Sequence, residues 1–169
     1  MENLLTTYEF QLWTDDFIIP NNINLNNNLF DSPLFLIEFR IQEFLRYLPE
    51  GGDSIVEEPR GPFTVRSFFL PSNAVIGDAD DDNSICETLS YFGVPLHRMP
   101  TVIGGISSFA RSMVAQTVNF GRPLLPIVVA IEVNTCNPRD LETAHRRKYG
   151  FIPEIEEEDK PMDKRPRID

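Results

Sequence analysis

The strongest constraint in the sequence is a helical pattern followed directly by a run of apolar β-formers, within residues 101–133. In the first half apolar side chains recur at steps of three and four, with polar side chains on the other side, which predicts an amphipathic helix. Pro100 suits the first turn of this helix, and Gly121 and Pro123 suit the chain just beyond its end. The apolar stripe consists of Ile103, Ile106, Phe109, Ala110, Met113, Val114 and Val118.

The run that follows the helix, residues 127–131, has no polar face. Its β-branched and small apolar residues predict a central strand that is covered on both sides, rather than an edge strand. A helix with one apolar stripe and a strand of this kind need each other as packing partners. We therefore expect them to form the centre of the core.

Residues 34–48 fit two patterns. Their side chains alternate as in a strand, but they also carry a helical stripe that would begin at Ser32 and Pro33. The enrichment in Phe and Ile favours a strand, and so does the turn signal around Gly51 and Gly52. A second alternating run, residues 63–70, is then expected to pair with the first as a hairpin with a long connection.

Three further segments complete the expected secondary structure. Residues 8–13 alternate between apolar and polar side chains, which predicts a short N-terminal strand that pairs with the sheet. Ser84 and Glu87 match a capping box, so a short helix is expected through Tyr91. Residues 134–139 are interpreted as a turn that leads to a basic patch at 145–148.

These patterns predict an α+β fold, with an antiparallel sheet of three or four strands and two helices packed on one face. We expect an N-terminal segment with an asparagine-rich loop over residues 1–33 and a single domain over 34–152. A charged, disordered tail is expected over 153–169. The chain has 169 residues, of which 41% are hydrophobic and 13 are Phe, which is enough to fill one core.

The formal net charge of −11 opposes binding to nucleic acid and to anionic membranes, so a protein partner is expected. Part of the charge lies in two acidic runs, around residues 78–82 and 154–159, and need not describe the folded surface. There is no apolar run of membrane-spanning length and no leader pattern. Two cysteines with free thiols indicate a reducing compartment, and therefore an intracellular protein of the cytoplasm or nucleus.

No metal site is predicted. The cysteines and histidines supply atoms that zinc binds, but their spacing contains neither a short cysteine knuckle nor a histidine pair. An acidic cluster could hold calcium, but it lacks the glycine and the closing glutamate of an EF-hand loop, so a solvated loop is expected. The first set is Cys86, His97, Cys136 and His145, and the second is Asp78, Asp80, Asp81 and Asp82.

Two adjacent glycines, Gly104 and Gly105, permit two interpretations. At the start of a helix they could cradle a phosphate, and within a helix they could allow close packing. No flanking lysine or complete glycine-rich motif accompanies them. No pair of a nucleophile and a base, and no pair of carboxylates, can be singled out, so no catalytic residue is assigned.

The order of several segments resembles the N-terminal region of plant RING-type ubiquitin ligases. The segments are residues 34–48, 63–71, 84–90, 107–113 and 125–129, with Phe151-Ile152-Pro153 similar to the point where the linker to the RING begins. The RING itself is absent, because two cysteines cannot build its two zinc sites. The resemblance implies a protein-interaction module that has no ligase residues of its own.

A second, partial resemblance is to acetyltransferases of the GNAT type. Gly104 and Gly105 lie before a helix and a strand, and residues 148–151 look like that family's later Tyr-x-Lys-x-Gly-Phe segment. Arg146 occupies the position of the motif's tyrosine, and the glycine spacing of the pyrophosphate loop is not reproduced. This alternative implies acetyl-CoA as cofactor, with Gly104 and Gly105 near its pyrophosphate.

Overall fold

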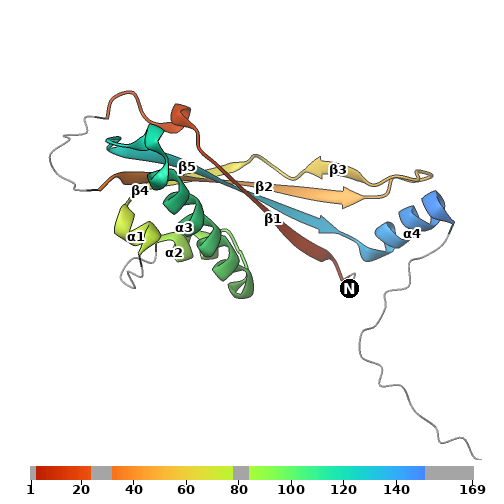
Figure 1. Ribbon diagram of the computed structural model, residues 1–169. Helices are drawn as coiled ribbons and strands as arrows, with labels where there is room; N and C mark the ends of the chain where they lie inside the picture. Colours follow the sequence, from red (N-terminus) through yellow and green to blue (C-terminus); the bar gives the residue numbers. More distant parts are fainter. Residues whose placement is uncertain (1–2, 24–31, 78–83, 151–169) are drawn as a thin grey trace, which may run out of the picture.

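The computed structural model describes residues 3–23, 32–77 and 84–150 (Figure 1). Within these ranges the chain forms a mixed five-stranded sheet with four α-helices and three short 3-10 turns. The strands are β1 (Leu5–Trp13), β2 (Leu34–Tyr47), β3 (Val56–Pro59), β4 (Thr64–Pro71) and β5 (Leu124–Cys136). The helices are α1 (Ser72–Ile76), α2 (Ser84–Tyr91), α3 (Met99–Ala115) and α4 (Pro138–Tyr149), and the 3-10 turns are η1 (Asp16–Ile18), η2 (Leu96–Arg98) and η3 (Thr117–Asn119).

The predicted α+β class is confirmed, but the sheet is mixed rather than antiparallel. β5 lies in the middle, antiparallel to β1 and parallel to β2. The other side of β2 pairs with β4 along its first half and with β3 along its second half. The chain leaves β4 at the end of the sheet where β2 begins, and α1, α2 and α3 return it to that end. β5 therefore has to run in the direction of β2.

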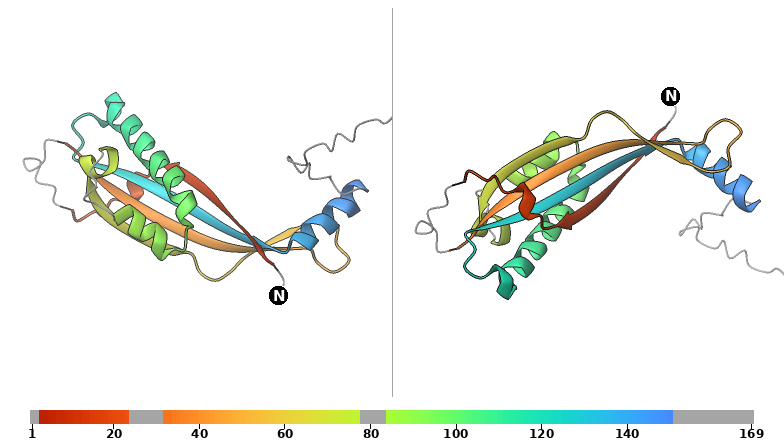
Figure 2. Two further views of the ribbon diagram at one scale, coloured as in Figure 1. Left: turned by 90° about the horizontal axis from the view of Figure 1, so that it is seen from below. Right: turned by 90° about the horizontal axis from the view of Figure 1, so that it is seen from above.

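Helices α1, α2 and α3 cover one face of the sheet, and α4 lies beyond its far end (Figures 1 and 2). The core forms between these three helices and the side chains of β2 and β5 that point toward them. Apolar side chains of β1 pack against the same core. Its fully buried members include Phe35, Ile37 and Phe39 of β2, Leu125, Ile127 and Val129 of β5, Leu89 of α2, and Ile106 and Ala110 of α3.

Most strand predictions are confirmed. Residues 34–48 form β2, residues 63–70 form most of β4, and the N-terminal alternation forms β1, which pairs with β5. The predicted long connection between β2 and β4 contains the additional strand β3. The turn predicted at residues 134–139 is wrong at its start, because β5 continues to Cys136. Asn134 is only 1% exposed, since Thr7 of β1 and Phe44 of β2 lie beside it.

The helix predicted from residue 101 is confirmed as α3, but it ends at Ala115, before the last residue of its proposed stripe. The buried Asn119 side chain donates a hydrogen bond to the Met113 carbonyl at 2.8 Å and closes the helix end. Val118 therefore falls in η3, where it is 77% exposed.

Two helices were not predicted. α1 is a single short turn after β4, and α4 contains the basic patch of residues 145–148. The Asn137 side chain accepts a hydrogen bond from the Arg139 backbone at the start of α4, and Gly150 ends it with a left-handed backbone. The Leu48 backbone donates to the Asp140 carboxylate, and Arg147 donates to the Gly52 carbonyl, so α4 is attached to the turn after β2.

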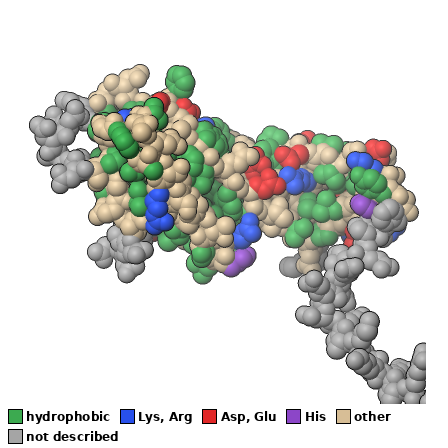
Figure 3. All heavy atoms as spheres, in the orientation of Figure 1, with side chains coloured by type: hydrophobic (Ala, Val, Ile, Leu, Met, Phe, Trp, Pro, Cys, Tyr) green, Lys and Arg blue, Asp and Glu red, His purple; other side chains and the backbone are tan. Residues whose placement is uncertain are grey.

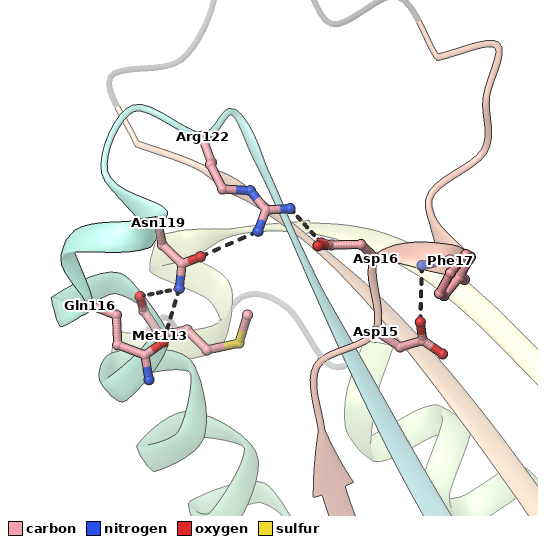
Figure 4. Close-up of polar contacts among 7 residues, drawn as sticks. All are labelled: Asp15, Asp16, Phe17, Met113, Gln116, Asn119 and Arg122. Carbon is pink, nitrogen blue, oxygen red and sulfur yellow. Dashed lines mark hydrogen bonds and ion pairs between the residues drawn. The ribbon is translucent and has the colours of Figure 1, made fainter.

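A polar network connects the end of α3 to the segment that follows β1 (Figure 4). The Arg122 guanidinium donates to the Asn119 side-chain oxygen at 3.3 Å and to the Asp16 carboxylate at 2.6 Å. Asp15 accepts a hydrogen bond from the Phe17 backbone and caps η1. Asn119 is buried, whereas the Asp16 side chain is 69% exposed, so water competes only for the outer part of the network.

This difference in burial predicts different costs for two substitutions. Asn119→Ala should lower the free energy of unfolding by about 0.5–1.5 kcal/mol, because it removes the buried hydrogen bond to the Met113 carbonyl. Arg122→Ala should cost about 0.2–1 kcal/mol, the usual range for an exposed ion pair. Urea denaturation of both variants measures the two costs. A larger cost for Arg122→Ala would contradict this description of the helix end.

Candidate functional site

The outer edge of β1 is one of the long edges of the sheet to which another strand could add. Within the described residues, β1 pairs with β5 on one side and has no strand on the other. It spans nine residues and contains neither proline nor lysine, two residues that commonly protect an edge from pairing. An edge of this kind presents unpaired backbone groups that a further strand can bind.

The turn before α3 covers one part of this edge. The Tyr8 hydroxyl donates to the Gly93 carbonyl at 3.2 Å, and the Arg98 guanidinium donates to the Tyr8 carbonyl at 3.2 Å. Backbone groups alternate between the two sides of a strand, so Phe10 and Leu12 direct theirs to the same side as Tyr8. Within residues 10–13, Phe10 and Leu12 therefore offer the backbone groups to which a partner strand can form hydrogen bonds.

An apolar hollow lies next to this part of β1, on the side of the sheet that α3 covers. Its volume is about 210 Å³. Pockets for drug-sized ligands and cofactors usually hold about 300–1,000 Å³, whereas a cavity of about 150 Å³ accepts benzene. The hollow therefore has the size for one apolar side chain. We call it the β1–α3 groove, and its lining residues are Phe10, Leu12, Thr101, Val102 and Gly105.

The two glycines of α3 occupy different positions relative to this groove. A Cβ atom at Gly105 would lie 3.5 Å from the Leu12 side chain, whereas a Cβ at Gly104 would meet nothing within 4 Å. Both glycines lie inside the helix, beyond its first turn, where backbone N–H groups bond to carbonyls of the preceding turn. Their N–H groups are therefore not arranged as a phosphate cradle, and Gly105 instead keeps the groove open.

Arg98 provides a positive charge at the end of the groove. Its guanidinium lies 5.8 Å from the centre of the Phe10 ring. Arg40, Arg46 and Arg122 each pair with a carboxylate, whereas Arg98 has no carboxylate within ion-pair distance among the described residues. Its Nε atom is buried and has no hydrogen-bond partner there.

The structure does not bring the predicted metal-ligand candidates together. Cys86 lies on α2, His97 in η2, Cys136 at the end of β5 and His145 on α4. No group of three His, Cys, Asp or Glu residues in the described ranges could hold a metal ion. The acidic cluster of residues 78–82 and the segment from Phe151 to Asp169 lie outside the described residues.

The charge of the described part differs from that of the whole chain. It contains 13 acidic and 11 basic residues, a formal charge of −2, so most of the net charge of −11 belongs to other segments. Charged side chains in Figure 3 gather between α4 and the group of α1, α2 and α3. No helix in the described part is long and apolar enough to cross a membrane.

The groove could not be found from local sequence patterns, because β1 and α3 are far apart along the chain. The two glycines were the only signal, and they were open to two interpretations.

Comparison with known proteins adds no assignment, since no protein-family model matches the chain, and neither a curated protein nor a solved structure is significantly similar to it.

Proposed function

We propose that this chain is a protein-interaction module without catalytic activity of its own, which binds an extended segment of a partner along β1. The observation that carries the proposal is the unpaired edge of residues 10–13 beside an apolar groove the size of one side chain. Addition of a strand to a sheet edge is a recurrent mode of peptide recognition, in which backbone hydrogen bonds give affinity and a side-chain pocket gives specificity.

The resemblance to the front region of plant RING-type ubiquitin ligases suggests which proteins are bound. Under that resemblance, the partner is a substrate or a component of the ubiquitin system. The chain carries no RING, so we expect no ubiquitin chains when it is the sole candidate ligase in an assay with purified components. Ubiquitin transfer that depends on this chain would overturn the non-catalytic part of the proposal.

The binding mode can be tested by selecting displayed random peptides of about ten residues on the full chain. We expect enrichment of sequences that have β-forming residues around one apolar anchor. Gly105→Leu should abolish their binding, because the new side chain fills the groove.

Gly104→Leu is the matched control, because it makes the same change one residue away and points into open space. Both variants gain helix propensity, so neither is expected to lose stability. Absence of enrichment on the full chain would contradict the proposed function, and so would equal binding by the two variants.

The acetyltransferase alternative predicts that a bound cofactor stabilises the fold. Acetyl-CoA at about one hundred times its dissociation constant would add about 2.7 kcal/mol, which raises the melting temperature by several degrees. Because Gly104 and Gly105 lie inside α3, we expect the melting temperature to remain unchanged. A clear rise that Gly104→Leu removes would instead favour the acetyltransferase.

A further inference from the structure

The Arg98 guanidinium at one end of the groove has no paired carboxylate among the residues that the structure describes, and this charge indicates the chemistry of the partner. The Arg98 side chain is held in place by two contacts, its hydrogen bond to the Tyr8 carbonyl and its position over the Phe10 ring. Neither contact neutralises the guanidinium. A carboxylate that approached it would form a charge-assisted hydrogen bond, one of the stronger polar contacts in proteins.

The position of Arg98 relative to the groove fixes the spacing of the two partner residues. The Phe10 ring both lines the groove and lies beneath Arg98, so the groove and the cation are on the same face of the sheet. In a strand added next to residues 10–13, side chains on one face are two residues apart. When one side chain of the added strand fills the groove, the side chain two residues away, on the same face, therefore faces Arg98.

We infer that the partner supplies an extended segment in which an apolar residue and an acidic residue are separated by one position. The apolar side chain fills the β1–α3 groove, and the carboxylate pairs with Arg98. This inference rests on the proposed function and adds the charge and spacing of the ligand. The occupant we assign is a separate protein that supplies this segment, because β1 of a second copy does not have the inferred spacing.

A second copy of β1 is a poorer occupant. Its one acidic residue is Glu9, and the residues two positions away, Thr7 and Gln11, are polar. Full antiparallel overlap of two β1 strands would also place Glu9 opposite Glu9, and like charges directly opposite each other destabilise a strand pair.

The test uses the full chain and synthetic versions of a selected peptide, one with Glu at the acidic position and one with Gln. We expect the Glu version to bind about tenfold or more tightly, as for a hydrogen bond between charged groups. Arg98→Gln should remove the difference between the two peptides, and Arg98→Lys should retain part of it.

Arg66→Gln is the matched control. Arg66 also lies over an aromatic ring, that of Tyr91, at 5.2 Å, but it belongs to β4 at the opposite edge of the sheet from β1. The Arg66→Gln variant should bind the Glu peptide more tightly than the Gln peptide, by the same factor as the unchanged protein.

The outcomes separate this inference from the proposed function. If no peptide is enriched, the proposed function itself fails. Two other outcomes would contradict the acidic residue of the partner but not the binding of a strand at β1. In the first, the Glu and Gln peptides bind equally. In the second, Arg98→Gln weakens the binding of both peptides to the same extent.

The sequence Ile155-Glu156-Glu157 in this chain also has the inferred spacing. Self-association that is lost on removal of residues 153–169, together with tighter peptide binding, would show that a second copy supplies the segment. That result would contradict our assignment of a separate protein as the occupant of the groove.

Discussion

Replacement of Phe39 by alanine should lower the free energy of unfolding by about 3–5 kcal/mol. Phe39 is fully buried in β2, and its ring stacks on Phe68 of β4 with 5.8 Å between the ring centres. The smaller side chain leaves a cavity in the core beneath the helices, which closely packed neighbours can fill only in part. Urea denaturation, with an unchanged dependence on denaturant, measures the loss.

Phe69→Ala is the matched control for this substitution. Phe69 follows Phe68 in the same strand, but its side chain is 46% exposed and lies on the other face of the sheet. We expect Phe69→Ala to lower the free energy of unfolding by less than half as much as Phe39→Ala does. Similar costs for the two variants would mean that the face covered by α1, α2 and α3 is not the main core.

Removal of residues 1–13 should abolish cooperative thermal unfolding. The deletion takes away β1 and exposes one side of β5 along nine pairs of residues. It also removes Tyr8, Phe10 and Leu12, which pack against the core. These side chains are partly buried, so their burial is worth roughly half of the full value, about 2–5 kcal/mol in total, which is a large part of the whole stability of a typical domain, about 5–15 kcal/mol.

Removal of residues 153–169 is the control truncation, because the composition of that segment predicts that it adds nothing to the core. It should change the melting temperature by no more than about 2–4 °C.

The N-terminal truncation also tests the domain boundary predicted at residue 34. A chain without residues 1–13 that melts sharply and near the original temperature would show that β1 is dispensable.

The elements that could be predicted from the sequence are those whose burial produces a clear period. α3 buries one stripe and β5 is buried on both faces, so each leaves a distinct pattern of apolar residues. α4 leaves no such pattern, because Ala144 is its only buried residue within the described chain. The indications of α4 were its end signals, Asn137 with Pro138 and then Gly150.

The arrangement of the strands and the groove could not be predicted in the same way. Whether β2 and β5 are parallel depends on the path that three helices take between them, and no local pattern records that path. The groove depends on Phe10, Arg98 and Gly105, which only the folded chain brings together. Each of these residues has an ordinary structural explanation when it is considered alone.

The most direct test of strand addition at β1 is amide hydrogen exchange of the full chain, measured with and without a selected peptide. Paired backbone N–H groups exchange more slowly, so the account predicts slower exchange at Phe10 and Leu12, whose N–H groups face outward, with no change along β3 and β4 on the opposite edge. Slower exchange along residues 56–71, with residues 10–13 unaffected, would contradict the assignment of β1 as the binding edge.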